Sequence, residues 1–260
     1  MRGMTLVMVA AWLLVSACGG ASTPVEHGGA GHGAVHWAYT GEGAPEHWGE
    51  LSEEFATCGT GQAQSPIDIV GAAGTDLPAL VFHYQPAPLS LINNGHAIEQ
   101  EFPEGSTLES NGRTYTLKQF HVHGPSEHTL NGQSFPMEMH FVHRAEDGSL
   151  AVVGLWIREG AENAALEGFF ANMPTAEART AEPEGLTLDP ATILPADRTY
   201  ARYSGSLTTP PCTEGVAWHM LQQPIEASAE QLARFAALYS GTNRPVQPLH
   251  ERALELDNTP

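Results

Sequence analysis

The sequence Gln119-Phe120-His121-Val122-His123 (QFHVH) alternates polar and apolar side chains. In a β-strand, alternate residues point to the same face of the sheet. Gln119, His121 and His123 therefore share one face of the expected strand, and Phe120 and Val122 share the other. Two imidazoles at positions i and i+2 point to one location above the sheet, which is a spacing typical of metal ligands on a strand.

The segment EMHFV at 138–142 repeats this alternation further along the chain, so Glu138 and His140 share a face. If the two strands pair antiparallel, His140 lies beside His121 and His123. Three neutral imidazoles leave one position of a tetrahedral zinc ion open, whereas structural zinc sites use four protein ligands. We therefore predict a catalytic Zn2+ held by these three histidines.

Further short apolar segments, separated by turn signals, predict a fold dominated by strands. The expected strands are Ala79–His83, Leu89–Asn93, Ala97–Phe102, Thr114–Val122, Glu138–His143, Leu150–Ile157 and Val216–Leu221. The segment Leu150–Ile157 is apolar at every position, which favours a central strand buried on both faces. Asn111-Gly112 is typical of a turn between two paired strands.

Helices are expected to be few and peripheral. The clearest is Ser228–Ser240, because Ser228 and Gln231 have the spacing of a capping box and Gly241 follows as an end signal. A second helix is expected at Asn163–Met173, before a proline. With no linker or repeat, residues 36–260 are predicted to form one mainly β (α+β) domain.

Composition narrows the classes of function. The 260 residues include 30 Asp plus Glu and 11 Lys plus Arg, which gives a formal net charge of −19. Such a charge repels phosphate backbones, so no nucleic-acid partner is expected. Thirteen histidines in so acidic a chain favour metal or proton chemistry.

The N-terminus is typical of an exported protein. Met1 and Arg2 precede an uncharged apolar run at 4–15, which is too short to span a bilayer and fits the core of a signal peptide at 1–17. The sequence VSAC at 15–18 resembles the lipobox of bacterial lipoproteins, which implies lipidation of Cys18. An ordinary secretory signal with an incidental cysteine is the alternative, and either reading predicts a periplasmic or cell-surface protein.

Residues 18–35 are rich in glycine and have no apolar period, so we interpret them as a lipidated, flexible tether. Cys58 and Cys212 are then the cysteines of the folded part. In an oxidising compartment two cysteines most simply form one disulfide, the alternative being two free thiols. The membrane is expected as a partner only through the lipid on Cys18.

Eight segments of the chain match, in order, those of one enzyme family. They are His36-Trp37-x-Tyr39, QSPIDI at 64–69, NNGH at 93–96, QFHVH at 119–123, SEHT at 126–129, EMHFVH at 138–143, SLTTPPC at 206–212 and NRPVQP at 243–248. From about His36 to Leu256 the chain resembles the α-class carbonic anhydrases. The resemblance implies a central, mostly antiparallel sheet of ten strands with zinc in a conical cavity, and it places Cys58 and Cys212 at a disulfide position.

The implied reaction is the reversible hydration of carbon dioxide to bicarbonate and a proton, by attack of zinc-bound hydroxide on CO2. The resemblance gives His96, Glu127 and Thr208 catalytic roles. Thr208 would orient the hydroxide and donate its own hydroxyl hydrogen to Glu127, and His96 would carry the released proton to solvent. Substrate binding is assigned to Val142, Val152, Leu207, Thr208, Thr209 and Trp218.

Three further residues are expected to hold the zinc ligands in place through hydrogen bonds. Gln119 would hold His121, Glu138 would hold His140, and the carbonyl of Asn243 would hold His123. Strand alternation independently puts Gln119 and Glu138 on the faces of their histidines.

Other features follow from the family pattern, and two residues depart from it. Gly124 stands where many members have tryptophan, and Glu99 where an amide is more common. The family's loops imply cis bonds at Ser65–Pro66 and Pro210–Pro211. If the segment is a strand, alternation puts Asn94, His96 and Ile98 on one face.

Two other functions compete with the enzyme. One is a zinc-binding or adhesion module of the same fold with little activity, because related domains have lost zinc ligands; the intact triad argues against it. The other is a zinc store that uses the histidines of the tether. The sequence also allows the protein to form a homodimer, with a second copy of the chain as its partner.

Overall fold

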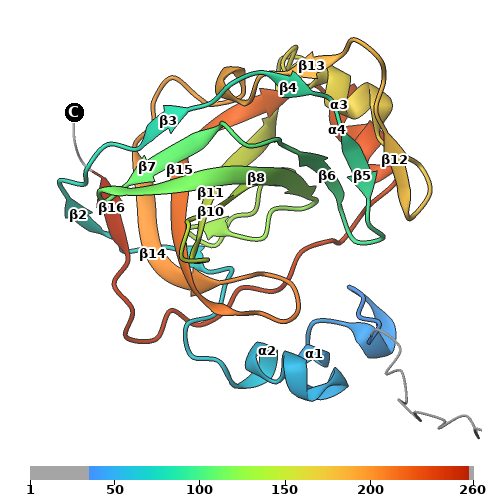
Figure 1. The fold of residues 1–260 in the computed structure, drawn as a ribbon. Helices are drawn as coiled ribbons and strands as arrows, with labels where there is room; N and C mark the ends of the chain where they lie inside the picture. Colours follow the sequence, from blue (N-terminus) through green and yellow to red (C-terminus); the bar gives the residue numbers. More distant parts are fainter. Residues whose placement is uncertain (1–34, 258–260) are drawn as a thin grey trace, which may run out of the picture. The chain divides into compact units, whose positions relative to one another are not determined.

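A single large β-sheet organises residues 35–257, the part of the chain that the computed structural model describes (Figure 1). Within this part the sheet has twelve strands, and ten of them follow one path in the order β12-β5-β6-β8-β10-β11-β15-β14-β16-β2. β3 and β7 are attached at the side through β8. All neighbours pair antiparallel except β11 with β15 and β16 with β2. The expected mostly antiparallel β architecture is confirmed.

The strands of this sheet are β2 (Ala73–Thr75), β3 (Val81–His83), β5 (Leu91–Asn93), β6 (Ile98–Glu101), β7 (Thr107–Ser110), β8 (Arg113–His123), β10 (Met137–Arg144), β11 (Leu150–Glu159), β12 (Arg179–Ala181), β14 (Tyr200–Ser206), β15 (Glu214–Ala227) and β16 (Glu255–Asp257). Two small sheets pair β1 (Asp68–Ile69) with β9 (Thr129–Leu130) and β4 (Ala87–Pro88) with β13 (Thr187–Leu188).

The helices are short and lie at the periphery of the sheet (Figure 1). They are α1 (Trp48–Leu51), α2 (Thr57–Thr60), α3 (Glu167–Asn172) and α4 (Ala229–Ala236), with 3-10 turns at Gly41–Gly43, Glu53–Phe55 and Pro190–Thr192. Of the described residues, none belongs to a helix with the length and hydropathy needed to cross a membrane.

The central strands lie as their sequences predict. β11 is buried at seven successive positions, Ala151 to Ile157, because sheet neighbours flank it and both of its faces are covered. β8 and β10 pair antiparallel, and His140 is in register with His121. The two histidine-bearing segments are therefore neighbours, as the alternation predicted.

The turn at Asn111-Gly112 is confirmed. Asn111 and Gly112 have φ values of 50° and 72°, and Ser110 pairs with Arg113 on either side of them. Positive φ at both central positions is what a tight two-residue hairpin requires, and asparagine and glycine tolerate it best.

Both helices predicted from sequence exist, but they are shorter than expected. α4 begins after Ser228, whose capping box with Gln231 is present, and it ends at Ala236. α3 begins at Glu167 and not at Asn163. The Asn163 side chain donates to the carbonyl of Glu226, and its backbone N–H donates to Gln231, so the Asn163 groups bond outside the helix.

The N-terminal part of the described chain is joined to a loop beside the sheet. Cys58 and Cys212 form a disulfide with a Cα–Cα distance of 5.0 Å, and they lie in an aromatic cluster with Trp48. The expected cis bonds at Ser65–Pro66 and Pro210–Pro211 are present, and Gly124–Pro125 is also cis, which was not predicted. The predicted signal peptide (1–17) and the tether with Cys18 lie outside the described residues.

Candidate functional site

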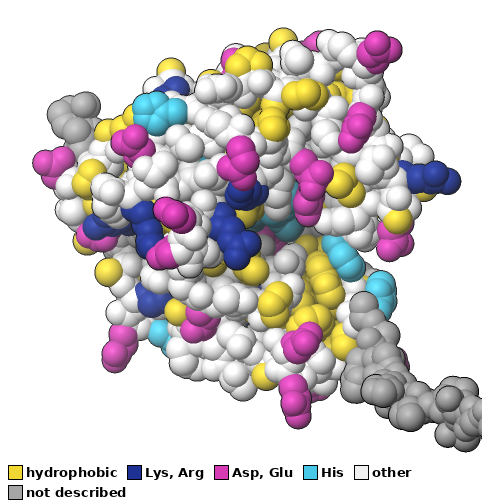
Figure 2. Space-filling view, in the orientation of Figure 1, with side chains coloured by type: hydrophobic (Ala, Val, Ile, Leu, Met, Phe, Trp, Pro, Cys, Tyr) yellow, Lys and Arg dark blue, Asp and Glu magenta, His cyan; other side chains and the backbone are white. Residues whose placement is uncertain are grey.

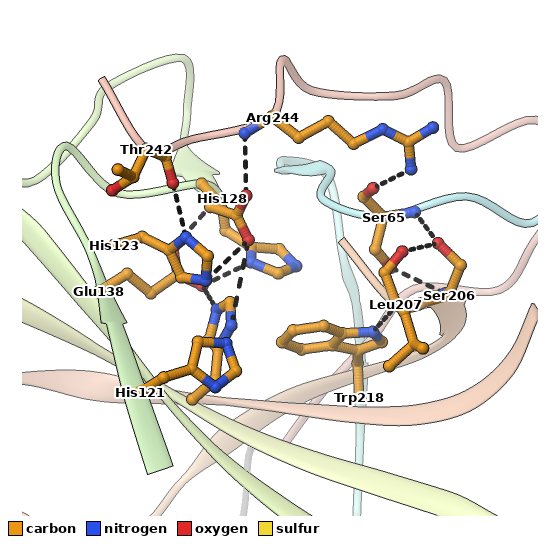
Figure 3. Close-up of polar contacts among 12 residues, drawn as sticks. Ser65, His121, His123, His128, Glu138, Ser206, Leu207, Trp218, Thr242 and Arg244 are labelled. Carbon is orange, nitrogen blue, oxygen red and sulfur yellow. Dashed lines mark hydrogen bonds and ion pairs between the residues drawn. The ribbon is translucent and has the colours of Figure 1, made fainter. Parts of the chain in front are cut away.

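Three histidine side chains converge above the centre of the sheet (Figure 3). His121 and His123 project from β8 and His140 projects from β10, with ring centroids 4.8–5.2 Å apart. One ring nitrogen of each lies within 4.8 Å of those of the other two. These are the three residues that the sequence predicted as metal ligands.

The outward ring nitrogens are all hydrogen-bonded to protein acceptors. His121 Nδ1 lies 2.8 Å from Gln119 Oε1, and His140 Nε2 lies 2.6 Å from Glu138 Oε1. His123 Nδ1 lies 2.6 Å from the carbonyl oxygen of Thr242. Because these nitrogens donate, the nitrogens that remain to accept a metal are Nε2 of His121, Nε2 of His123 and Nδ1 of His140.

The partner of His123 differs from the expected one, since the carbonyl belongs to Thr242 and not to Asn243. The carbonyl of Gly124 accepts hydrogen bonds from the N–H groups of both Gly241 and Thr242. The N–H of Gly124 in turn donates to the Thr242 hydroxyl at 3.1 Å. These bonds fix Thr242 opposite His123, one residue earlier in the loop than the resemblance implied.

The electrostatics of the cluster favour neutral imidazoles. Burial and the neighbouring imidazoles of His123 and His140 hold the pKa of His121 well below its usual range. Burial also lowers the pKa of His123, although the Glu127 carboxylate opposes this effect. Neutral imidazole is the form that binds a metal, so the donor set fits the electron-pair requirement of zinc.

Two buried polar atoms at this point have no hydrogen-bond partner among the described residues. They are Nε2 of His123 and Oε2 of Glu127, which lie 3.5 Å apart. An orphaned buried donor or acceptor is destabilising. A cation between the imidazoles would give Nε2 of His123 the partner that it lacks, so the residues present fit a metal ion.

The expected hydrogen bond from Thr208 to Glu127 is not formed. Oε1 of Glu127 accepts from the backbone N–H of Arg244 at 2.8 Å, while Oε2 has no hydrogen-bond partner. Oε2 instead faces the imidazole cluster, 4.0 Å from Nδ1 of His140. Thr208 is buried in the loop that follows β14.

A chain of buried hydrogen bonds extends from His140 and Glu138 away from the cluster, and sequence reasoning did not assign a role to its further members, His128, Tyr203 and Ser65. Glu138 Oε1 also accepts from Nδ1 of His128 at 2.7 Å, and His128 Nε2 lies 2.6 Å from the Tyr203 hydroxyl. Tyr203 contacts the Ser65 hydroxyl at 2.7 Å. Burial would raise the pKa of Glu138, but His128 and His140 outweigh it and hold that pKa far below its usual range.

An apolar wall adjoins the histidines. Val152 is in register with Val142 on one side and with Trp218 on the other, and all three pack in one cluster with Leu207. The Trp218 ring lies 4.9 Å from that of His140, and its N–H donates to the carbonyl of Ser206 (Figure 3). The four apolar residues assigned to substrate binding are therefore brought together beside the cluster.

His96 lies in a turn, so the strand-face argument for its direction was wrong. The side-chain oxygen of Asn94 accepts from the N–H groups of His96 and Ala97, and β6 begins only at Ile98. The His96 ring stacks on Trp37, with centroids 3.6 Å apart and an interplanar angle of 11°.

The two departures from the family pattern have local explanations. A Cβ atom built on Gly124 would lie 3.1 Å from the ring of Phe235, so this ring fills the space beside Gly124. Glu99 accepts a hydrogen bond from Asn94 at 2.6 Å. Burial and the Glu101 carboxylate raise the pKa of Glu99.

The surface above the cluster is hollowed. Figure 2 shows a depression near the centre of this face with histidine at its floor, acidic side chains along one rim and hydrophobic side chains along another. The depression therefore approaches the cluster along one polar and one apolar side.

Comparison with known proteins agrees with this geometry. The family model for eukaryotic-type carbonic anhydrase matches residues 43–257. The carbonic anhydrase of Klebsiella pneumoniae is 46% identical over 224 residues, covering 85% of this chain and 91% of that one. The carbonic anhydrase of Neisseria gonorrhoeae is 45% identical over 228 residues, covering 86% of this chain and 90% of that one.

A solved structure of the alpha-carbonic anhydrase from Thermovibrio ammonificans, in complex with the inhibitor sulfanilamide, aligns with a TM-score of 0.83 and 41% identity. The alignment covers 86% of this chain and all of the other. Family match, sequence identity and fold coincide with a histidine triad able to bind a metal. The chain belongs to the α-carbonic anhydrases, zinc enzymes that interconvert carbon dioxide and bicarbonate.

Proposed function

We propose that His121, His123 and His140 bind the catalytic zinc through Nε2, Nε2 and Nδ1, and that the surrounding residues carry out CO2 hydration. The observation that supports this most is that each outward ring nitrogen is already engaged by Gln119, Thr242 or Glu138. When bound, zinc supplies Lewis-acid activation of a water molecule, which provides a nucleophile at neutral pH.

Carbon dioxide is apolar, and we assign its binding to the wall formed by Val142, Val152, Leu207 and Trp218. This wall excludes water and holds the substrate next to the cluster without polar contacts that would favour bicarbonate over CO2. Thr208 and Thr209 follow Leu207 directly, so polar groups continue where the apolar wall ends.

Thr208 and Glu127 are assigned to orienting the attacking oxygen. Oε2 of Glu127 is a buried acceptor that faces the imidazoles and has no hydrogen-bond partner among the described residues. A carboxylate held in this way by the Arg244 N–H can accept a hydrogen bond only from a group that enters the cavity or turns toward it.

His96 is assigned to proton removal. It lies in a half-buried turn and stacks on Trp37. Imidazole gains and loses protons near neutral pH, so it can accept a proton from the cavity and release it to buffer.

The test is stopped-flow CO2 hydration and zinc analysis on a small set of variants. His140→Ala should lose zinc and activity together, because only two imidazoles remain. Thr208→Ala should keep zinc and lose about 10²–10³ in rate, the usual effect of removing one preorganised hydrogen bond. His96→Ala should be slow only in dilute buffer and should recover when imidazole is added. Full zinc occupancy in His140→Ala would contradict the ligand assignment.

We further propose that the protein is exported and anchored in a membrane through a lipid on Cys18. The support is the sequence alone: a short apolar run, VSAC at 15–18, and a glycine-rich segment before the domain. Radiolabelled palmitate should be incorporated into the full-length chain and not into Cys18→Ser. Release of both forms into the soluble periplasmic fraction would favour an ordinary secretory signal.

We also propose that a second copy of the chain is a partner, so that the protein forms a homodimer. The main path of the sheet ends at β12 and β2, and edge strands present backbone groups that can pair with another chain. Analytical ultracentrifugation of the zinc-loaded protein at several micromolar concentrations tests this. The mass of a monomer at all of these concentrations would contradict the proposal.

A further inference from the structure

Burial of its ring and the neighbouring imidazole of His36 disfavour the charged form of His96. Trp37 covers one face of the ring at 3.6 Å, and the ring of His36 lies 6.1 Å away. Burial, and then the nearby His36, lower the pKa of His96. A proton acceptor in such a place needs an opposing negative charge to remain useful at neutral pH.

The carboxylate of Glu177 lies against the residue that precedes His96. A Cβ atom built on Gly95 would lie 2.6 Å from Oε1 of Glu177, so the carboxylate packs directly on the Gly95 backbone. Gly95 has a φ of +90°, a conformation that other residues adopt only with strain. The absence of a side chain at position 95 is what admits the carboxylate.

The loop that carries Glu177 is fastened to the turn of His96 by Asn93. Asn93 Nδ2 donates to the carbonyl of Pro174 at 2.9 Å, and the Asn93 carbonyl accepts from the N–H of Ala178 at 2.8 Å. The side-chain oxygen of Asn93 accepts from the Gly95 N–H at 3.0 Å. Glu177 therefore lies between two anchored residues, although its side chain is exposed.

We propose that Glu177 is a positioning residue for proton transfer, whose carboxylate stabilises protonated His96 and so increases the rate at which the proton leaves the cavity. The proposal rests on the shuttle function proposed above for His96. It adds a residue from the loop before β12, a part of the chain that contributes nothing else to the site.

The charges around His96 agree in direction with this proposal. Glu177 raises the pKa of His96, opposing burial and His36. Burial and then Glu177 raise the pKa of Tyr239, whose hydroxyl donates to the side-chain oxygen of Asn93. On the turn of His96 itself, Asn94 holds Glu99 in a hydrogen bond. Because Glu177 is exposed, its effect should be screened by salt.

The test compares Glu177→Gln with Glu182→Gln in the zinc-loaded enzyme. Glu182 is a matched control, since it is exposed, follows β12 and bonds to Ser90, away from the site. In Glu177→Gln the His96 ring protons should titrate at lower pH by NMR. The kcat for hydration in dilute buffer should fall about two- to fivefold, the range expected for an exposed charge pair. The kcat/KM should stay unchanged, because CO2 attack precedes proton removal.

The outcomes separate the two proposals. An unchanged His96 titration in Glu177→Gln, or the same change in Glu182→Gln, overturns the role of Glu177. A loss of kcat that persists at 1 M salt, about 3 Å Debye length, also overturns it, because a screened charge would no longer act. Full activity of His96→Ala in dilute buffer would instead overturn the shuttle function itself.

Discussion

At the scale of single residues, the site depends on which group faces each imidazole. Gln119 and Glu138 lie two positions from His121 and His140 on the same strand faces, so alternation alone places them. Thr242 reaches His123 from a loop 119 positions further along the chain. An acceptor that comes from a distant loop depends on the geometry of that loop. This is why the resemblance pointed to the carbonyl of Asn243, one residue away from the acceptor found.

The Thr242 hydroxyl gives a prediction at this scale. It accepts from the Gly124 N–H and is buried, so Thr242→Val removes a hydrogen bond that holds the carbonyl on His123, while Thr242→Ser keeps it. Loss of a group that orients a metal ligand typically weakens binding 10- to 100-fold. We expect zinc to transfer to a chelator about tenfold faster from Thr242→Val than from Thr242→Ser. Equal rates for the two variants would show that the hydroxyl does not matter.

At the scale of elements, the disulfide joins α2 to the loop between β14 and β15. Cys212 follows Pro211 in this loop, and its N–H donates to the carbonyl of Thr209 at 2.8 Å. Gln64 adds a hydrogen bond to the Cys212 carbonyl at 3.1 Å. The loop that carries Thr208 is thus fixed from outside the sheet, because its own residues form only short turns.

Removal of this crosslink should destabilise the domain. The bridge spans 154 residues, and closing a loop of that length is worth about 5 kcal/mol in the chain-entropy model. The Cys58→Ser/Cys212→Ser variant should lose up to about that much free energy of unfolding, and its midpoint in denaturant, measured by tryptophan fluorescence with zinc present, should be lower. Identical midpoints for the variant and the reduced and oxidised wild type would contradict this prediction.

At the scale of the whole molecule, His143 and His219 lie deep in the fold and away from the metal site. His143 is completely buried and bonds to Tyr84, and His219 is buried beside Ser110. Burial lowers the pKa of His143 to about 3 and that of His219 to about 4. Both are therefore neutral in the folded protein over the pH range in which an exposed histidine is protonated.

These two groups make stability depend on pH. Between pH 6.5 and about 4 the unfolded chain binds protons at both histidines and the folded chain does not, so the free energy of unfolding falls as pH falls. Each histidine contributes about 1.4 kcal/mol per pH unit in this window and nothing above it. In urea titrations with chelator present, His219→Leu/Ser110→Ala should lose that share of the slope. The wild type should keep the full slope, and equal slopes for the two proteins would refute the assignment.

The sequence by itself determined the strands that carry the site and the residue types on them. Alternation in QFHVH and EMHFV places three imidazoles and two of their partners, because a strand has only two faces. The capping box at Ser228 and the Asn111-Gly112 turn were likewise readable, since both are local interactions. The presence of two cysteines in the folded part already favoured one disulfide, and the resemblance placed Cys58 and Cys212 at its position.

Only the tertiary structure decided the contacts between segments far apart in the chain. These are the Thr242 carbonyl on His123, the Arg244 N–H on the Glu127 carboxylate, the turn of His96 against Glu177, and the hydrogen bond from His128 to Tyr203. Each depends on the position of a loop, and loop positions follow from packing and from distant hydrogen bonds, for which a linear sequence carries no period.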